Sequence, residues 1–480
     1  KNKNYVIKNK AAYSKLFKNI EGRTLDDQQI ESIVKDDVNN LVIAGAGSGK
    51  TITIVGKVKY LIEKDKYKPE ELLVLSFTNG SASEMKERIS KETKADIDVM
   101  TFHKLGKEII AAAEKKQPDL TSILLPKFVN ETFKKKMEDH NFKKLILDYF
   151  LSFIKEYKSQ FEFENKGEYY KYLRDNDIVT FMGEKVKSYQ EMEIANFLFI
   201  NNIKYEYERK YEILTSDMNY SEYHPDFYLP DYKIYIEHFG IDKSGNVPAY
   251  FKGKDGKSAK ETYNEGIAWK RNIHKQKNTI LVETYSYEKE NDVLITNLKK
   301  KLLNYNVVFK ELSDDEKFKI INEKSKLTES ALANLISTFI CLIKANSYSI
   351  NDIENKNQVI NSGFNRIRNS KFINIVKYIY DEYEYQLSAN NEIDFNDMIN
   401  KATGYVKNNM FDKKYSYIIV DEFQEISYSR YNLIKSIKDK NKSKLFCVGD
   451  DWQSIYRFAG SDINFFTPIL QRMTTTLSPD

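Results

Sequence analysis

Cysteine, proline and glycine are all scarce in this sequence of 480 residues, which contains 2, 8 and 18 of them respectively. Two cysteines cannot form a disulfide framework or a four-cysteine zinc site, so we expect a reducing, cytoplasmic compartment. No run of 18 or more apolar residues is present, which argues against a membrane span. The first residues, Lys-Asn-Lys-Asn-Tyr, lack the apolar core of a signal peptide.

The remaining composition is that of a folded chain. Hydrophobic residues make up 41% and charged residues 30%, which argues against intrinsic disorder. The length corresponds to about three domains of ~150 residues each. Seventy-five basic and seventy acidic residues give a net charge of +5, which permits nucleic-acid binding without indicating it.

Apolar runs alternate with helical segments near the start of the chain. Residues 41–44, 72–77 and 98–103 have the pattern of buried strands, and 51–62 and 81–92 that of the helices between them. Strands that alternate with helices predict a parallel α/β sheet. Two further buried-strand runs occur only much later, at Tyr417–Val420 and Leu445–Val448, so a long insertion is expected to interrupt this sheet.

A glycine-rich loop follows the first of these strands. It reads Ala44, Gly45, Ala46, Gly47, Ser48, Gly49, Lys50 and Thr51, and it opens a helix. Backbone N–H groups in such a loop surround a phosphate, and the helix N-terminus adds favourable partial charge. Lys50 is expected to reach the β- and γ-phosphates and the Thr51 hydroxyl to bind Mg²⁺, although Ala44 replaces the usual first glycine.

Two carboxylates follow the strand at residues 417–420. Asp421 and Glu422 are expected at the carboxyl edge of the sheet, where ligands bind. Asp421 would hold Mg²⁺, and Glu422 would orient the attacking water. Together with the glycine-rich loop, the pair predicts hydrolysis of a nucleoside triphosphate.

The ordered motifs resemble superfamily 1 DNA helicases of the UvrD/Rep/PcrA type, in a helicase IV-like form. The motifs that carry the resemblance are residues 25–29, 44–51, 76–79, 101–103, 394–397, 420–424 and 448–460. One departure is Gly80, which stands where relatives commonly carry Lys.

The resemblance implies ATP as the nucleotide, with Gln29 reading adenine and Gln453 coupling the γ-phosphate to DNA. It also implies single-stranded or partly duplex DNA as partner and 3′-to-5′ movement. Base stacking is implied for Phe77, Tyr456 and Phe458, and contacts to the DNA backbone for Thr78, Asn79, Thr101 and His103.

The family's later motifs have no match in the eighteen residues after Asp462. In the family these motifs form a second RecA-like domain, whose arginines close on the γ-phosphate. We therefore expect that domain to come from a missing C-terminal part or from a partner chain, and we expect this chain alone to bind ATP but hydrolyse it poorly.

A second group of acids lies within the insertion. A helix is predicted from Ser188 to about residue 200, a strand at Tyr205–Tyr211, and a hairpin that turns at Pro230-Asp231. The hairpin would bring Asp226 and Glu237 opposite each other, as oxygen ligands for Mg²⁺ or Mn²⁺.

This segment resembles the PD-(D/E)xK nuclease fold, in which a lysine usually sits two residues after the second acid. Phe239 occupies that position here, so Lys270 is the candidate lysine and His238 the alternative. The resemblance makes Glu191 a further carboxylate, with Glu193 as its competitor. A zinc site built from the histidines of this segment has no supporting ligand spacing.

The expected fold is α/β, a P-loop RecA-like parallel-sheet domain with a helical insertion that carries a smaller α+β nuclease-like domain. The expected function is an ATP-dependent DNA helicase or translocase coupled to a metal-dependent nuclease-like module, in DNA repair or defence against foreign DNA. Its rivals are a DNA-binding ATPase whose inactive insert docks DNA or a protein, and a half-motor completed by a partner chain. The expected segments are 1–106 and 411–480 (RecA-like), 107–185 and 311–410 (helical), and 186–310 (nuclease-like).

Overall fold

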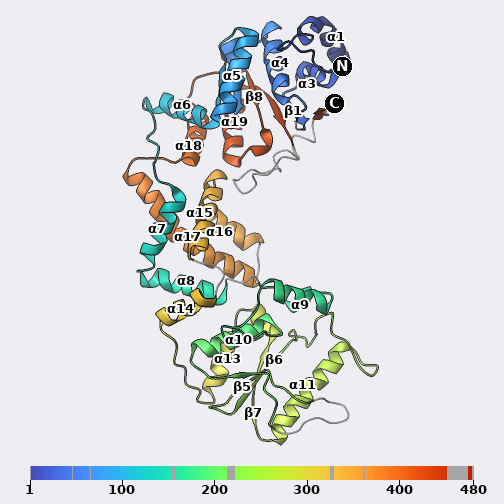
Figure 1. Ribbon diagram of the computed structural model, residues 1–480, viewed down its shortest axis with the longest axis vertical. Helices are drawn as coiled ribbons and strands as arrows, with labels where there is room; N and C mark the ends of the chain where they lie inside the picture. Colours follow the sequence, from blue (N-terminus) through green and yellow to red (C-terminus); the bar gives the residue numbers. More distant parts are fainter. Residues whose placement is uncertain are drawn as a thin grey trace. The chain divides into compact units, whose positions relative to one another are not determined.

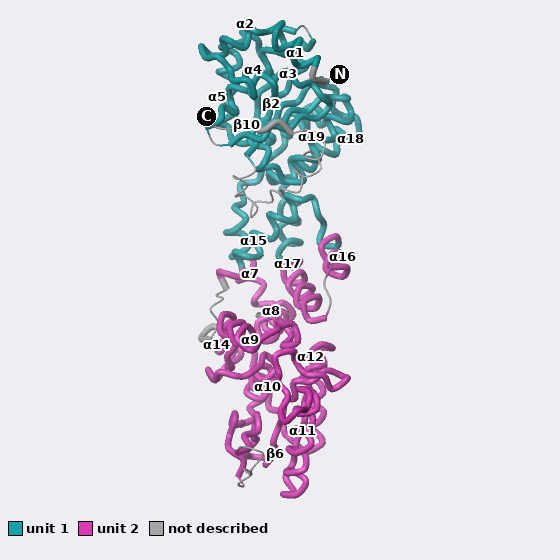
Figure 2. Tube along the Cα trace, turned by 90° about the vertical axis from the view of Figure 1, so that its right-hand side faces the viewer, with its two compact units in different colours: residues 1–130, 333–351, 379–480 teal, residues 131–332, 352–378 magenta. Residues whose placement is uncertain are grey.

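The computed structural model describes residues 2–45, 47–64, 66–153, 157–212, 222–324, 329–360, 363–450 and 474–477. The chain divides into two compact units (Figure 2). Unit 1 comprises residues 1–130, 333–351 and 379–480, and unit 2 comprises residues 131–332 and 352–378. The five-segment division expected from the sequence is finer than this and stays a prediction.

Unit 1 contains a six-stranded sheet in which every recorded strand pair is parallel. The strand order is β10-β1-β9-β8-β2-β3, so the chain crosses over two strands between β1 and β2. Figure 1 labels β1 and β8 of this sheet. The strands are β1 (Asn39–Ala44), β2 (Leu72–Ser76), β3 (Asp98–Thr101), β8 (Tyr417–Val420), β9 (Lys444–Gly449) and β10 (Thr474–Leu477).

Helices cover both faces of this sheet, which explains why its strands are continuous apolar runs rather than alternating ones. Val74 and Ile419 pack with the helices of one face, whereas their neighbours Leu75 and Ile418 pack with those of the other. The first face is covered by α3 (Asp27–Val34), α4 (Lys50–Glu63) and α5 (Asn79–Thr93), and the second by α6 (Phe102–Glu114), α18 (Phe395–Lys407) and α19 (Tyr428–Asn441).

Unit 2 contains a four-stranded sheet in the order β4-β5-β6-β7. The β4–β5 and β5–β6 pairs are antiparallel and the β6–β7 pair is parallel. The predicted strand at residues 205–211 is much shorter in the structure, where only β4 (Glu206–Tyr207) is strand. The other strands are β5 (Phe227–Leu229), β6 (Ile234–Phe239) and β7 (Ile280–Tyr285).

The second sheet also lies between helices. Ile194 of α10 (Tyr189–Ile200) and Leu298 of α13 (Leu294–Leu303) belong to the same core as Ile236. Trp269 of α11 (Ala259–Gln276) packs instead against the tyrosine cluster on the other face. The chain order is therefore a helix, three antiparallel strands, a helix, and a strand parallel to the third.

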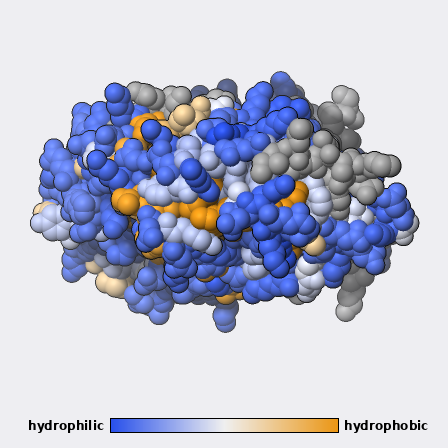
Figure 3. All heavy atoms as spheres, turned by 90° about the horizontal axis from the view of Figure 1, so that it is seen from below, coloured by the Kyte–Doolittle hydropathy of each residue, from blue (hydrophilic) through white to orange (hydrophobic). Residues whose placement is uncertain are grey.

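The remaining elements are helical. They are α1 (Asn2–Ala12), α2 (Ser14–Phe17), α7 (Leu125–Lys136), α8 (His140–Ser152), α9 (Lys166–Asp175), α12 (Ser286–Glu290), α14 (Asp314–Lys324), α15 (Glu329–Ala345), α16 (Ile350–Ile360), α17 (Gly363–Ala389), and the 3-10 turns η1 (Pro69–Glu71), η2 (Gln160–Glu162) and η3 (Phe423–Glu425). No single helix of the described residues is long and apolar enough to cross a membrane; one pair, bent by 97° between Ala345 and Ile350, passes that test together. In the view of Figure 3 the surface is mostly hydrophilic, with a short hydrophobic band.

Candidate active sites

The loop between β1 and α4 is held by its own hydrogen bonds and by one side chain from α3. The backbone N–H and the hydroxyl of Ser48 both donate to the carbonyl oxygen of Gly45, at 3.3 and 2.7 Å. Gly49 has a φ of +80°, and a Cβ at this position would lie 2.5 Å from the Nε2 of Gln29. The turn into α4 therefore requires glycine at position 49. Ala46 lies outside the described residues.

Gln29 has a structural role next to this loop. Its backbone N–H donates to Asp26 at 2.7 Å, and its side-chain oxygen accepts from the Asp26 N–H at 3.1 Å, which completes a capping box at the start of α3. Its Nε2 donates to the carbonyl of Ser48 at 3.2 Å. The amide that the resemblance assigns to adenine therefore contacts the phosphate loop, and its adenine-reading role stays a prediction.

Lys50 and the acidic pair at the end of β8 face each other. The Nζ of Lys50, the first residue of α4, lies 3.4 Å from a carboxylate oxygen of Glu422. Glu422 is in the left-handed region with a φ of 48°, and its N–H donates to the Asp421 carboxylate at 2.9 Å. Thr51 follows Lys50 and is half-buried. The structure thus brings the lysine of the loop to the carboxylates, although they are more than 370 residues apart.

The charge of the acidic pair Asp421 and Glu422 is only partly compensated by Lys50. Burial and the neighbouring Glu422 raise the pKa of Asp421 to about 6. The amide of Gln424 donates to Glu422 and accepts from the Asp450 N–H at 3.0 Å, which fixes the end of β8 against the end of β9. A cation bound at this edge of the sheet would stabilise the charged form of the Asp421 carboxylate.

Beside this edge, the residues predicted to contact DNA occupy the ends of β2 and β3. Thr78 and Thr101 are the N-caps of α5 and α6, and their hydroxyls accept from Ser81 N–H at 3.1 Å and Lys104 N–H at 3.2 Å. Asn79 begins α5 and is exposed. The two threonines are therefore at least helix caps, and their contact with DNA stays a prediction.

Phe77 and His103 form a partly exposed aromatic patch with two residues that the sequence analysis did not single out. The guanidinium of Arg430 lies 5.0 Å from the centre of the Phe77 ring. The ring of Phe395, which is 57% exposed, meets His103 edge-on at 5.1 Å. Burial and Arg430 lower the pKa of His103 to about 4, so His103 is neutral near pH 7. Gln453, Tyr456 and Phe458 lie outside the described residues.

A second site lies in unit 2, in a cavity of about 200 Å³. Glu191, Asp226, Glu237 and Lys270 all line it. Asp226 precedes β5 and Glu237 lies on β6, and the antiparallel register brings the two opposite each other. The Lys270 Nζ, from α11, is 2.5 Å from one carboxylate oxygen of Glu237. The structure therefore brings together four side chains from four separate segments.

Three acids and three lysines line this cavity, and of the lysines among the described residues Lys270 is the one whose ammonium pairs with one of the acids. Burial and Asp226 raise the pKa of Glu237 to about 8 and that of Glu191 to about 7. Burial also raises the pKa of Asp226. Among the described residues, no donor lies within hydrogen-bond geometry of the second carboxylate oxygen of Glu237, which is buried; the Tyr223 hydroxyl nearby lowers the pKa of this carboxyl. A buried carboxylate oxygen among several acids fits a divalent cation, because such a cation would stabilise their charged forms.

The Glu191 carboxylate accepts more hydrogen bonds than the Glu237 carboxylate does. Glu191 accepts hydrogen bonds from the Lys187 N–H at 3.0 Å, the Ser188 hydroxyl at 2.9 Å and the Tyr207 hydroxyl at 2.6 Å. In the described ranges no three Asp, Glu, His or Cys side chains are close enough together to hold a metal ion. The two carboxylates predicted as cation ligands, Asp226 and Glu237, lie opposite each other in this cavity, and their binding of a cation stays a prediction.

The competing candidates point elsewhere. His238 faces β7, where its two ring nitrogens lie 3.0 Å from the Thr284 hydroxyl and 3.3 Å from the Ser286 hydroxyl. Burial lowers its pKa to about 3. Glu193 pairs with Lys289 at 2.5 Å. His238 also lines the cavity, but its ring nitrogens contact these hydroxyls, whereas the Lys270 ammonium contacts Glu237; Glu191 lines the cavity and Glu193 does not.

Most of the chain also matches the sequence pattern of a known protein family. The UvrD/REP helicase N-terminal domain matches residues 25–224 and 255–473. The chain belongs to this family. The match leaves residues 225–254 uncovered, and those residues include Asp226 and Glu237.

Three curated relatives align with most of this UvrD/REP-family chain. DNA helicase IV of Escherichia coli is 23% identical over 95% of the chain. The RecBCD enzyme subunit RecB of Borreliella burgdorferi is 25% identical over 92%, and an ATP-dependent helicase/nuclease subunit of Alkaliphilus metalliredigens is 24% identical over 89%. The alignments cover 44%, 36% and 35% of these relatives, so the chain spans less than half of their length.

Two functional candidates in this UvrD/REP-family chain escaped sequence reasoning. Arg430 lies on α19, more than 300 residues from Phe77 in the sequence, and it belongs to no motif. Lys344 is buried against Asp394 at 2.8 Å and Asp397 at 2.9 Å, which steadies the cap of α18 before Phe395. Only the acidic motif at residues 394–397 could have suggested a basic partner.

Proposed function

We propose that this chain is the ATP-binding part of a DNA helicase or translocase that carries a metal-dependent nuclease-like module, acting in DNA repair or in defence against foreign DNA. The observation that carries the proposal is the approach of Lys50 to Glu422 across the phosphate loop and the end of β8, at 3.4 Å. Membership of the UvrD/REP family supports ATP and DNA as the substrates, and we propose that the DNA is single-stranded or partly duplex.

The phosphate loop and the acidic pair have separate tasks in this proposal. The backbone N–H groups at the start of α4 and the Lys50 ammonium would hold the phosphates. Thr51 and Asp421 would hold Mg²⁺, which supplies charge neutralisation at the phosphates when bound. Glu422 would accept a hydrogen bond from the attacking water and orient it, with Gln424 fixing its carboxylate.

A DNA-stimulated ATPase assay tests the motor part. We expect slow ATP hydrolysis that single-stranded DNA accelerates, and we expect Glu422→Gln to keep nucleotide binding while losing the stimulated rate. The matched control is Glu425→Gln on the same turn, which retains the carboxylate pair. Absence of ATP binding by the wild-type chain would contradict the proposal.

The nuclease-like part rests on the acid-rich cavity of unit 2. Asp226 and Glu237 would hold Mg²⁺ or Mn²⁺, which activates water when bound. Lys270, paired with Glu237, would stabilise negative charge at the reacting phosphate. The Alkaliphilus metalliredigens relative is named as a subunit of an ATP-dependent helicase/nuclease, which supports the same pairing of activities here.

Cleavage of end-labelled single-stranded and duplex DNA with Mn²⁺ tests this part. Asp226→Ala should abolish cleavage while leaving ATP binding in place. If the wild-type chain cleaves neither substrate with Mg²⁺ or Mn²⁺, the result would favour the rival function. That function is a DNA-binding ATPase whose insert only docks DNA or a protein. Cleavage that persists in Asp226→Ala would instead place the activity outside this cavity.

A further inference from the structure

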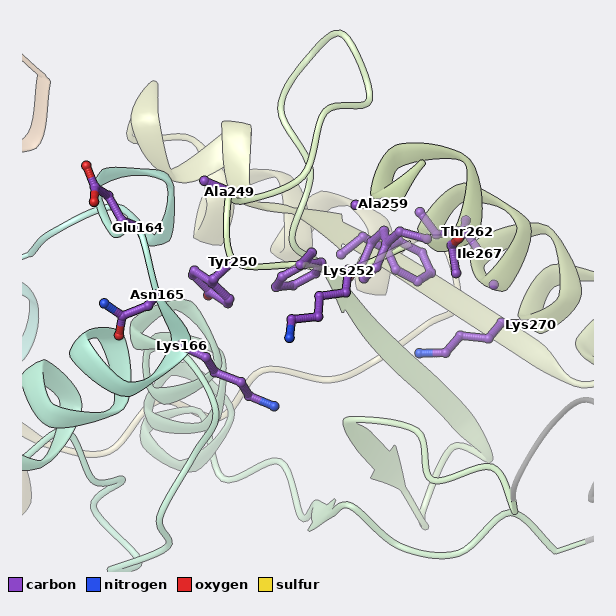
Figure 4. A pocket seen from close by; sticks show the side chains of 14 residues that line it. Glu164, Asn165, Lys166, Ala249, Tyr250, Lys252, Ala259, Thr262, Ile267 and Lys270 are labelled. Carbon is purple, nitrogen blue, oxygen red and sulfur yellow. The ribbon is translucent and has the colours of Figure 1, made fainter. Parts of the chain in front are cut away.

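A larger pocket adjoins the acid-rich cavity of unit 2. Its volume is about 930 Å³, which is the size of a nucleotide-binding rather than a water-binding space. The two cavities share five lining residues, so they adjoin each other. We call the larger one the aromatic pocket, defined by Lys166, Tyr250, Phe251, Lys252, Tyr263 and Lys270 (Figure 4).

Aromatic rings form a continuous row along this pocket. Tyr250 stacks on Tyr169 with ring centres 5.9 Å apart and meets Phe251 edge-on at 5.1 Å. Phe251 in turn contacts Tyr263 at 5.3 Å. Tyr250, Phe251 and Tyr263 are only partly buried, which leaves ring surface open to a ligand. Such a row accepts successive flat groups, as single-stranded nucleic acid presents them.

The charge of the aromatic pocket is positive. Three lysines and one acid, Glu164, line it; Lys270 is paired with Glu237 of the adjoining cavity, which leaves Lys166 and Lys252 against one acid. Figure 4 shows the side chains of Lys166, Lys252 and Lys270 extending into the same space, with Tyr250 between the first two. Lys252 is exposed, and within the described residues it forms no ion pair with a carboxylate. Unneutralised ammonium groups beside aromatic rings suit phosphates joined to bases.

The α11 side of the pocket is kept open by a small residue. Gly266 lies in the middle of α11, where a Cβ would meet no atom within 4 Å. One turn farther along the helix, Lys270 reaches the acid-rich cavity. A strand lying along this face of α11 would therefore pass from the rings to the carboxylates.

We propose that the aromatic pocket binds single-stranded nucleic acid, with bases on Tyr250 and Phe251 and phosphates on Lys166 and Lys252, and delivers the strand to Asp226 and Glu237. This inference rests on the proposed nuclease-like function for what happens at the carboxylates, and it adds the substrate class and its path. An acidic peptide would use the lysines but would leave the row of rings without flat partners.

Photo-cross-linking with a short oligonucleotide that carries 5-iodouracil tests binding directly, because the adduct forms with a stacked ring. We expect the intact chain, with Ca²⁺ in place of Mn²⁺, to give an adduct at Tyr250 or Phe251 that mass spectrometry locates. Tyr250→Ala should weaken binding at this pocket roughly tenfold, since stacking is lost. Lys252→Ala should weaken it roughly threefold.

Two matched pairs of variants separate pocket binding from general effects. Lys254→Ala removes an exposed lysine of the same loop that does not line the pocket, and it should behave like wild type. Gly266→Leu should obstruct the α11 side of the pocket and weaken the adduct, whereas Gly266→Ala adds a single methyl group in open space and should retain it. Thermal unfolding of each variant checks that the chain still folds.

The outcomes distinguish this inference from the function on which it rests. An adduct in the pocket without cleavage by the wild type would support strand binding but remove the nuclease-like function. Cleavage without an adduct, undiminished in Lys252→Ala and Gly266→Leu, would overturn the pocket and leave the nuclease-like function standing. Absence of both adduct and cleavage would overturn both.

Discussion

The site at the loop between β1 and α4 in unit 1 and the acid-rich cavity of unit 2 both pair a lysine with a carboxylate, but they are built differently. In unit 1 the backbone forms most of the site: the loop is closed by Ser48 and Gly45, and glycine is required at position 49. In unit 2 side chains from four separate segments meet in a buried space. A site that one continuous segment of backbone forms can be predicted from a sequence motif. A site that side chains from separate segments form cannot be predicted in this way.

Burial also separates the two sites. The Glu422 side chain is 33% exposed and faces Lys50, so solvent and nucleotide can both reach it. The Glu237 side chain is 1% exposed, and among the described residues no donor lies within hydrogen-bond geometry of one of its oxygens. A change in unit 1 should therefore act locally, while a change in unit 2 should move the titration of every acid in the cavity.

The largest expected effect is that of Lys50→Ala. On the role proposed for Lys50 at the phosphates, loss of its ammonium should reduce ATP hydrolysis by about 10²-fold or more, as measured by phosphate release. Mn²⁺-dependent cleavage without ATP should keep its wild-type rate, because Lys50 belongs to a different unit from the acid-rich cavity.

The control for this change is Lys59→Ala, farther along the same helix, where the lysine pairs with Glu92 at 2.6 Å. It should leave hydrolysis close to wild type. A fall in ATP-free cleavage in Lys50→Ala would show that the two sites are not independent. It would contradict the conclusion that changes in unit 1 act locally.

Asp226→Asn should have the next largest effect. In wild type, Mn²⁺ at 100 times its dissociation constant should stabilise the fold by about 2.7 kcal/mol, and the variant should lose this gain. Without metal the variant should be at least as stable as wild type, because burial disfavours the Asp226 charge and Asn still accepts from the His238 N–H. Thermal unfolding with and without Mn²⁺ measures both.

Asp231→Asn is the matched control, since Asp231 is an exposed acid in the turn of the same hairpin. It should keep the full Mn²⁺ stabilisation. If Asp226→Asn also kept it, the cation would be bound elsewhere, and the acid-rich cavity would be a structural cluster only.

The metal-free chain should lose stability as the pH rises. The pKa of Glu237 is about 8 in the folded chain against an ordinary 4.5, so between these values the folded chain holds a proton that the unfolded chain has released. That stability is fully present below about pH 4.5 and is lost as the pH rises to about 8, with a slope of up to ~1.4 kcal/mol per pH unit.

Unfolding in EDTA at about pH 6 and about pH 8 measures this slope. Glu237→Gln should flatten it, while Glu206→Gln, which removes an exposed carboxylate from β4, should not. An unchanged slope in Glu237→Gln would mean that another group carries the pH dependence.

The sequence was sufficient to predict what lies close together along the chain. The strand, loop and helix around residues 44–51 are present, and so is the hairpin that turns at Pro230-Asp231, because apolar runs and turn residues decide both locally. The choice between His238 and Lys270 also follows from strand geometry. Since side chains alternate across a strand, His238 cannot face the same side of β6 as Glu237.

Long-range pairings were not predictable in the same way. Arg430 reaches Phe77 from a helix far along the chain, and the aromatic pocket combines α9, the loop at residues 249–252 and α11. Nothing in the periodicity of a helix says which distant strand it will cover. The burial of the second Glu237 oxygen is likewise a property of packing, which no single segment contains.

The smallest expected effect concerns Gly80, in the first turn of α5. Gly80 is exposed, and a Cβ there would have the Thr78 hydroxyl, 4.0 Å away, as its nearest neighbour. A lysine side chain can therefore be added without displacing any group. Gly80→Lys should tighten binding of single-stranded DNA by roughly threefold and increase the salt dependence of affinity by about one ion.

Fluorescence anisotropy of a labelled oligonucleotide across a salt series measures this change, and Gly80→Ala is its control. Alanine also favours the helix over glycine, by roughly 0.5–1 kcal/mol, but adds no charge, so it should leave the salt dependence unaltered. An equal gain in both variants would assign the effect to helix stability instead of a phosphate contact. A gain with lysine alone would show that one exposed position in unit 1 can be changed without altering its neighbours. In unit 2, by contrast, a change to one buried acid alters the titration of the others.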